Sequence, residues 1–279
     1  LLFIKTVKAC VLCCLLPMIG TCVYDLIVED DNGALSMYKA STTPADPVKG
    51  VLDALALAAE DREMPLADML ARGDMLIHGT THAINAIITG NTARTAFLTT
   101  AGHPDILVLR EGGRIEPFNF VAPYPEPYVL RALTFEVPER INSAGAPHTP
   151  LDEAATIEII GRLREAHVEA VAVCFLWSIS NPAHELRVGE LLTDHLPGVP
   201  YTLSHQINPA LREYRRASAT AIDASLKPLM GKYLGGLTER LTAAGFEGDT
   251  SDSHRVTVLS PFPVPGWLAS ENGGATKKH

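Results

Sequence analysis

The feature that most constrains the fold is a regular alternation of predicted helices and strands between residues 151 and 205. The elements are a helix at 152–166, a strand at 170–175, a helix at 182–195 and a strand at 201–203. The first helix carries Asp152 and Glu153 at its start, where the helix dipole favours negative charge. Strands joined through helices lie parallel in one sheet. The segment therefore predicts an α/β fold with parallel strands.

The flanking sequence predicts more strands and helices. Strand-forming residues at 24–29 and 34–39 enclose Asp30-Asp31-Asn32-Gly33, a turn typical of a β-hairpin. Further predicted elements are a helix at 48–60, strands at 74–78 and 95–99, a helix at 83–88, a helix or strand at 106–110, strands at 133–137 and 139–142, and one long helix or two over 217–244, interrupted at Pro228. The region 111–127 is too rich in proline for a regular element.

The first nineteen residues allow three interpretations. Lys5 and Lys8 precede the apolar run 9–19, as in a secretory leader, and this run is too short to span a membrane. The alternatives are a buried first strand and a segment of aberrant origin, such as a mispredicted exon. We favour these two over the leader, because a leader should be followed by a complete domain start.

Charge and cysteine content exclude several classes of protein. The formal charge of −9 argues against nucleic-acid binding, which needs clustered lysines and arginines. Four of the five cysteines lie between residues 10 and 22 and the fifth is Cys174, which gives neither a disulfide framework nor paired zinc ligands. We expect a globular cytoplasmic protein with no metal site of its own, bound to neither nucleic acid nor membrane.

Four separated motifs, in order, resemble the hydantoinase A and 5-oxoprolinase family. They are HGTTHAINA at 78–86, ARTAFLTTAG at 93–102 with REGGR at 110–114, AVCFLWS at 172–178 with NPAHE at 181–185, and SHQINP at 204–209 with the residues that follow to Thr220. The chain is identified on these motifs as the N-terminal region of such a subunit. The resemblance covers about residues 24–246.

The resemblance implies a fold and a domain plan. The fold is a ribonuclease H-like lobe of an actin-like ATPase, with an N-terminal β-hairpin and parallel strand–helix units. Residues 1–23 would be an atypical hydrophobic segment, 24–246 the family's N-terminal domain, and 247–279 a divergent, poorly ordered tail.

The resemblance also implies an activity, cofactors and partners. Family members hydrolyse cyclic amides such as hydantoin or 5-oxoproline with ATP and Mg²⁺, and related subunits serve ATP-dependent carboxylation of acetone or acetophenone. The expected partners are a small cyclic amide or ketone and a hydantoinase B-like subunit or domain. Phosphoryl transfer of this kind depends on positioning and charge neutralisation.

The sequence departs from the family at its phosphate loop, which reads D-x-G-G-T-F-T-D in relatives. Here only Gly20 and Thr21 correspond, as candidate cofactor-binding residues, and no aspartate precedes them. Without that carboxylate a bound Mg²⁺ lacks its anchor. The second lobe of the actin-like fold also has no counterpart after Phe246. A third hypothesis is therefore an inactive fragment that only binds a partner.

The HGTT motif supplies most of the candidate site. It lies where a predicted strand runs into a helix, a place that favours an anion. His78, Thr80 and Thr81 are candidate catalytic residues, and Gly79, which allows close approach, is a candidate cofactor-binding residue. In the alternative interpretation, Thr80 or Thr81 caps the helix and His78 is a core histidine.

Four other residues complete the candidate site. Asn85, one helical turn after Thr81, either contacts substrate or braces the loop. Arg110 and Arg114 flank two glycines and are candidate substrate-binding residues, or part of a surface turn. His205 is a candidate catalytic residue beside Arg212, Glu213, Arg215 and Arg216, which could instead form an ion-pair network that pins a helix.

Overall fold

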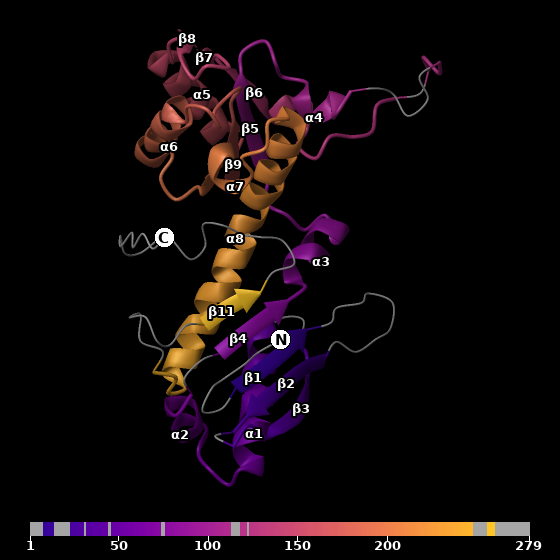
Figure 1. Ribbon diagram of the computed structural model, residues 1–279, viewed down its shortest axis with the longest axis vertical. Helices are drawn as coiled ribbons and strands as arrows, with labels where there is room; N and C mark the ends of the chain where they lie inside the picture. The colour runs from indigo at the N-terminus through magenta and orange to yellow at the C-terminus, as the bar shows by residue number, and fades with distance from the viewer. Residues whose placement is uncertain are drawn as a thin grey trace. The chain divides into compact units, whose positions relative to one another are not determined.

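The structure is a computed structural model that describes residues 8–13, 23–30, 32–43, 46–73, 76–112, 118–121, 123–247 and 256–259. The chain forms two compact units (Figure 1). Unit 1 contains residues 1–91 and 229–263, and unit 2 contains residues 92–228 and 264–279. The region predicted as one domain, 24–246, thus includes most of both units, and the outer boundaries at 23 and 246 stay predictions.

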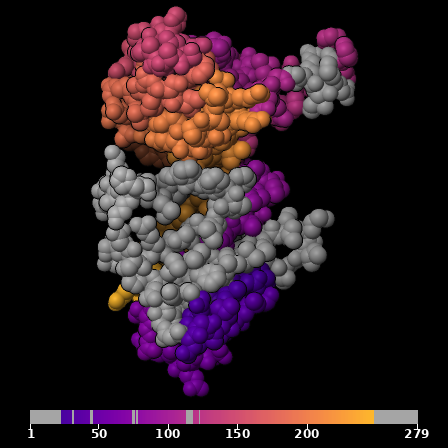
Figure 2. Space-filling model, viewed as in Figure 1, coloured from indigo at the N-terminus to yellow at the C-terminus, as the bar shows by residue number. Residues whose placement is uncertain are grey.

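Unit 1 is built on a five-stranded sheet with the order β11-β4-β1-β2-β3. The strands are β1 (Lys8–Cys13), β2 (Val23–Glu29), β3 (Leu35–Ser41), β4 (Leu76–Thr80) and β11 (Val256–Leu259). The predicted hairpin is confirmed as β2–β3, and Asp30 Oδ1 accepts hydrogen bonds from the backbone of Asn32 and Ala34 at 2.9 and 2.8 Å. Side chains of this hairpin form a continuous indigo surface (Figure 2).

The N-terminal segment contributes a strand to this sheet. β1 pairs antiparallel with β2 and parallel with β4, so both of its edges are hydrogen-bonded. Its register places Leu12 opposite Gly79 and Cys13 opposite Thr80. Residues 8–13 of the first nineteen thus form a strand, as one of the three interpretations expected. The carboxyl end of this strand pairs with the HGTT motif.

Helices pack against the sheet of unit 1. They are α1 (Pro47–Asp61), α2 (Leu66–Ala71), α3 (His82–Thr89) and the part of α8 (Glu213–Ala243) that follows Pro228. Fully buried residues of β2 and α1, including Leu26, Val28, Val51 and Leu55, form the core between helix and sheet. Burial of each such side chain favours folding by about 1.5–3 kcal/mol.

Unit 2 contains a four-stranded parallel sheet with the order β10-β9-β5-β6. The strands are β5 (Thr95–Thr100), β6 (Thr134–Val137), β9 (Ala170–Cys174) and β10 (Tyr201–Leu203). The predicted parallel α/β arrangement is confirmed. Every residue of β5 and β9 is buried, as expected of central strands in a parallel sheet.

The remaining elements of unit 2 connect these strands. They are α4 (Ile106–Leu109), η1 (Arg131–Leu133), β7 (Arg140–Ile141), β8 (Pro147–Thr149), α5 (Glu153–Glu165), α6 (Ala183–His195), α7 (Ser204–Ile207) and the first part of α8. The predicted start of α5 is confirmed, because Asp152 Oδ1 accepts a hydrogen bond from Ala155 N at 3.0 Å. The segment 106–110, which the sequence left open, is helical.

Several elements differ from expectation. The interruption expected at Pro228 is absent, since α8 continues through this residue as a single described helix. The sequence did not predict α2, β8 or β11. β11 lies within 247–279, and of that segment the structure describes only Glu247 and this strand.

Across the described ranges, none of the helices combines the length and the apolar character required to span a bilayer.

Candidate functional site

The HGTT motif begins in the middle of a paired strand. His78 is fully buried in β4, and its Nε2 lies 2.6 Å from the hydroxyl of Tyr233 in α8. Burial lowers the pKa of His78 to about 3, so the imidazole is neutral at physiological pH. Its Nδ1 has no hydrogen-bond partner among the described residues. Gly79 lies between Leu12 of β1 and Leu259 of β11, inside the sheet rather than in the turn.

The two threonines of the motif lie at the start of α3. Thr80 Oγ1 accepts a hydrogen bond from the backbone of His82 at 3.1 Å, whereas the Thr81 side chain makes no capping bond. Asn85 Nδ2 donates to Thr81 Oγ1 at 3.3 Å. Thr80 therefore helps to satisfy the helix start, and Asn85 braces Thr81, in agreement with the structural alternatives for both residues.

A cavity of about 200 Å³ lies beside these residues in unit 1. Hydroxyl, amide and aromatic groups from β2, the segment before α1, α3 and α8 line it. The lining residues are Tyr24, Thr42, Pro47, Thr80, His82, Asn85, Ala86, Thr89, Asn91, Leu229 and Tyr233. Two of the site residues predicted from the sequence, Thr80 and Asn85, thus line the same cavity.

Tyr24 forms one wall of this cavity because α1 makes room for it. Its hydroxyl donates to the Pro47 carbonyl at 2.7 Å. A Cβ atom at Gly50 would lie 2.3 Å from the Tyr24 ring, so only glycine fits at this point of α1. Neither residue was singled out from the sequence. The available signal was a glycine on the apolar face of a predicted helix, because such a glycine often marks a place where another part of the chain packs closely against the helix backbone.

The cavity is electrically neutral over its described lining. No Lys, Arg, Asp or Glu side chain is among the residues that line it. Burial also lowers the pKa of His82, whose ring lies over that of Tyr233 with a centroid distance of 5.1 Å. The ligand that such a site suits is small, uncharged and able to form hydrogen bonds.

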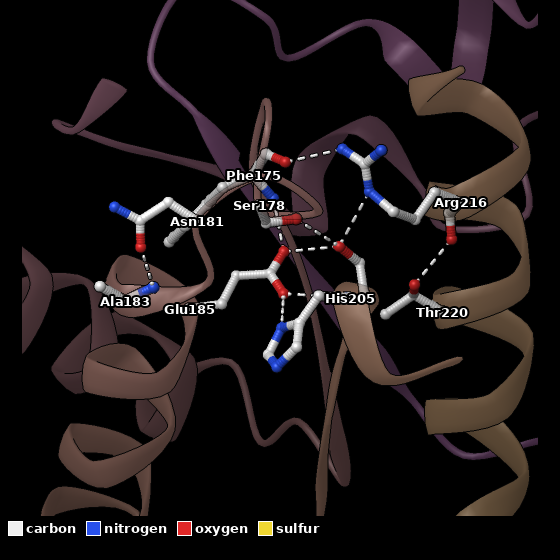
Figure 3. A network of polar contacts seen from close by, with 9 residues as sticks. Phe175, Ser178, Asn181, Ala183, Glu185, His205, Arg216 and Thr220 are labelled. Atoms are coloured by element: carbon white, nitrogen blue, oxygen red, sulfur yellow. Dashed lines mark hydrogen bonds and ion pairs between the residues drawn. The ribbon is translucent and has the colours of Figure 1, made fainter. Parts of the chain in front are cut away.

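His205 belongs to unit 2, where it forms a separate buried network (Figure 3). Its Nδ1 lies 2.6 Å from Oε2 of Glu185, a fully buried carboxylate of α6. Glu185 also accepts hydrogen bonds from the backbone of Phe175 at 2.9 Å and from the hydroxyl of Ser204 at 2.5 Å. The carboxylate thus has donors on both oxygens, which compensates for its burial.

Arg216 supplies the positive charge of this network. It is fully buried in α8 and donates to Ser204 Oγ at 3.0 Å, to the Ala210 carbonyl at 2.8 Å and to the Phe175 carbonyl at 2.7 Å. These bonds join the end of β9, α7 and α8 through side chains. For His205 and Arg216 the geometry supports the pinning alternative.

A second buried carboxylate lies next to the first. Glu139, just after β6, accepts hydrogen bonds from the hydroxyl of Thr100 and from His184 Nδ1, the latter at 2.8 Å. Burial raises the pKa of Glu139, and the neighbouring charge of Glu185 adds to this effect. The sequence showed His184 and Glu185 within the NPAHE motif, but it gave no sign that Glu139 would join them.

The other predicted residues lie elsewhere. Arg110 is an exposed residue of unit 2 at the end of α4, with a φ of +58°. The neighbouring Glu111 forms an ion pair with Arg215. Gly20, Thr21 and Arg114 lie outside the described residues. The catalytic candidates are thus divided, with His78, Thr80 and Thr81 in unit 1 and His205 in unit 2, and their roles stay predictions.

Neither a cluster of metal ligands nor a cationic phosphate site is found among the described residues. They contain no group of three or more His, Cys, Asp or Glu side chains arranged to hold a metal ion. The cavity offers no cationic side chain among its described lining residues, whereas polyphosphate sites depend on charge neutralisation.

Comparisons with known proteins place the chain in a family. Residues 19–196 match the family described as the hydantoinase/oxoprolinase N-terminal region. The chain is 37% identical over 212 residues to the caprolactamase subunit alpha of Pseudomonas jessenii. This match covers 75% of this chain and 30% of that subunit. It is 30% identical over 243 residues to the acetophenone carboxylase gamma subunit of Aromatoleum aromaticum. This match covers 82% of this chain and 33% of that subunit.

A solved structure agrees with the sequence comparisons. The crystal structure of the ATP-dependent caprolactamase from Pseudomonas jessenii superposes with a TM-score of 0.75 and 32% sequence identity, over 90% of this chain and 35% of that one. The chain thus spans about a third of the length of these relatives. Since the family match extends over more than half of the 279 residues, the chain belongs to the hydantoinase/oxoprolinase N-terminal family.

Proposed function

We propose that this chain is the amide-binding part of an ATP-dependent enzyme that hydrolyses cyclic amides. The observation that carries the proposal is the neutral, polar cavity beside the HGTT motif in unit 1. A lactam presents an N–H donor and a carbonyl acceptor on adjacent atoms, and it carries no charge. A relative with a similar chain is named as a caprolactamase, an enzyme of this substrate class.

The cavity has hydrogen-bonding groups for such a ligand. Thr42 Oγ1 is a buried atom with no partner among the described residues. An unsatisfied buried hydroxyl is unfavourable by about 1–3 kcal/mol, which a ligand's hydrogen bond would recover. Asn85 uses its Nδ2 to brace Thr81, and its side-chain oxygen, Oδ1, has no hydrogen bond within the described part of the chain. We assign the Thr42 hydroxyl as the donor to the amide carbonyl of the ligand. Asn85 Oδ1 is then the acceptor of the ligand's N–H group.

We also propose that unit 1 is the ribonuclease H-like lobe of an actin-like ATPase. Three antiparallel strands, β1 to β3, are followed through helices by β4 and β11, which lie parallel on the other side of β1. This order supports the lobe implied by the sequence motifs. An experimental structure with a different strand order in unit 1 would contradict it.

A ketone carboxylase subunit is the second candidate function. It is favoured by the similarity to the acetophenone carboxylase gamma subunit, and a ketone is also small and uncharged. The two substrate classes differ in one group, since a ketone lacks the N–H donor. If Asn85 accepts a hydrogen bond from the ligand, a lactam binds more tightly than a ketone of the same shape.

The decisive experiment compares 2-pyrrolidone with cyclopentanone, two five-membered rings that differ in this N–H group. Binding is measured by titration calorimetry and by ligand-observed NMR. We expect 2-pyrrolidone to bind about fivefold more tightly, the equivalent of one hydrogen bond. Equal or tighter binding of cyclopentanone would favour the ketone function. Binding of neither would reject both and leave a role in partner binding, as with a hydantoinase B-like subunit.

Two threonine variants locate the ligand in the cavity. Thr42→Val removes a hydroxyl that has no described partner, and it should weaken 2-pyrrolidone binding about fivefold. Thr89→Val is the matched control, because the Thr89 hydroxyl already donates to the backbone carbonyl of Asn85 at 2.8 Å. If both variants bind as the parent chain does, the lactam occupies another site.

ATP use is tested separately by titrating Mg²⁺-ATP into the chain. A defined binding isotherm would support ATP use by this chain itself. Heat no greater than background would limit the chain to amide binding.

A further inference from the structure

We infer that the cavity of unit 1 selects uncharged lactams and rejects lactams that carry a carboxylate. This inference rests on the proposed function and narrows its substrate class. It separates two kinds of cyclic amide that the family name covers, since hydantoins and simple lactams are neutral whereas 5-oxoproline is an anion at pH 7.

The first support is the chemistry of the lining. Of the eleven residues that line the cavity, none has a side chain that is a permanent cation. The two histidines near it, His82 in the wall and His78 behind Tyr233, are buried enough to be neutral at physiological pH. A carboxylate that entered would lose water without gaining an ionic partner, and an uncompensated buried charge is strongly unfavourable.

The second support is that three cations of unit 1 are paired with carboxylates that lie in or next to the chain segments lining the cavity. Arg240 donates to both carboxylate oxygens of Asp46, at 2.9 and 2.7 Å. Asp46 directly precedes Pro47, which lines the cavity. Lys49 pairs with Asp53 at 2.5 Å, and Lys39 pairs with Asp25 at 3.0 Å. A substrate carboxylate would have to compete with these carboxylates.

One feature acts in the opposite direction. α3 begins at His82 in the cavity wall, and a helix start favours an anion. The backbone N–H of His82 is already bonded to Thr80 Oγ1, however, and α3 has only eight residues. A helix dipole changes affinity by about two- to fivefold at such a position. The missing cation outweighs this contribution, because charge burial without a partner changes affinity by orders of magnitude.

The test uses 2-pyrrolidone and 5-oxoprolinate, which share the same lactam ring and differ in the carboxylate. Titration calorimetry at pH 7 on the full chain should show 2-pyrrolidone binding at least about tenfold more tightly. If 5-oxoprolinate bound equally or more tightly, the inference would be wrong while the proposed amide-binding function stood. Binding of neither ligand would overturn both.

A variant that introduces a positive charge tests whether the cavity lining causes the preference for uncharged lactams. Thr89→Lys places an ammonium group at an exposed position of the lining, and it should improve 5-oxoprolinate binding about fivefold relative to 2-pyrrolidone. Asn85→Lys, one turn earlier on α3, is the second variant. An unchanged ratio in both folded variants would overturn the inference, because the charge of this cavity would then not determine the preference.

Discussion

The two units bury polar groups in different ways. In unit 2, Glu185 and Arg216 are fully buried, and every bonding group of the carboxylate has a donor from the surrounding chain. In unit 1, Thr42 Oγ1 and His78 Nδ1 are buried without a described partner, near a hollow of about 200 Å³. A satisfied network stabilises a fold, whereas unsatisfied polar atoms beside a cavity indicate a place for a ligand.

The comparison also changes how the sequence motifs are understood. The sequence left open whether His205 and the arginines near it act in acid–base or phosphate chemistry or form a network that pins a helix. In the structure His205 and Arg216 make their bonds within unit 2. The HGTT motif has its hydroxyl and amide groups at an open space. We therefore expect substitutions in unit 2 to affect stability most, and substitutions at the cavity to affect binding most.

The largest expected effect is that of Glu185→Gln. The new amide group would face donors from Phe175, Ser204 and His205, and one or more buried groups would lose their partner. We expect the free energy of unfolding to fall by about 3 kcal/mol. Urea denaturation followed by tryptophan fluorescence, to which Trp177 of unit 2 contributes, measures this change.

Glu158→Gln is the matched control, because Glu158 is an exposed residue of α5 in the same unit. Its midpoint should equal that of the parent chain. If Glu185→Gln unfolded at the same urea concentration as the control, the network would not hold unit 2 together, and a catalytic role for His205 and Glu185 would become the better explanation.

The next effect is that of Gly50→Ala in unit 1. The added methyl would overlap the Tyr24 ring, which is held by its hydrogen bond to Pro47. We expect a loss of about 2 kcal/mol together with weaker lactam binding, since Tyr24 lines the cavity. Gly235→Ala in α8 meets no atom within 4 Å and should raise stability by about 0.5–1 kcal/mol. The reverse ranking would contradict the close contact between α1 and β2.

The third effect is a pH dependence specific to unit 1. The folded-state pKa of His78 is about 3 and the unfolded value is 6.5, so the unfolded chain binds more protons between these values. Stability is thus complete above pH 6.5 and is lost as pH falls, by about 1.5 kcal/mol between pH 6.5 and pH 5. His78→Gln should remove this slope in chemical denaturation series.

Tyr233→Phe distinguishes the cause of the slope. It removes the hydrogen bond to His78 but keeps the ring buried. The variant should be about 1 kcal/mol less stable at every pH and should keep the slope, because burial is the main cause of the shift. A flat pH profile in Tyr233→Phe would mean that the tyrosine, and not burial, holds the pKa of His78 low.

The smallest effect on stability is expected for Thr80→Val. The hydroxyl accepts one backbone hydrogen bond at the start of α3, worth about 0.5–1 kcal/mol. The loss of binding free energy for 2-pyrrolidone should exceed the loss of free energy of unfolding. Calorimetry measures the first quantity, and the melting temperature from differential scanning fluorimetry reports on the second. A loss of stability with unchanged binding would make Thr80 a helix cap alone.

Much of the fold could be predicted from local pattern. The apolar runs of β5 and β9 and the turn sequence of β2–β3 have clear local signals, and their pairing follows from general rules for parallel sheets and hairpins. β11 and α2 were missed because each is short, with 4 and 6 residues, and too few apolar positions to show a period. Pro228 suggested a break because proline lacks the backbone donor, yet α8 continues through it.

The candidate site was less predictable, for a physical reason. The HGTT motif stood out, but its environment comes from residues distant in sequence, such as Tyr233, which is 155 positions from His78. The burial of Glu185 and Arg216 likewise depends on tertiary packing that no local window contains. Sequence reasoning found the residues but could not determine which had their bonds already satisfied.

The division of unit 1 into two chain segments has a consequence for synthesis. Residues 1–91 leave the ribosome first, but the segment from 229 onwards that completes their unit follows only after residues 92–228. Unit 2 can thus finish its sheet while β1 to β4 still wait for α8 and β11. Contacts closed over such a long loop form slowly. The cavity is therefore expected to be among the last parts of the molecule to mature, and the lactam binding proposed here should be absent from a nascent chain stalled before Tyr233.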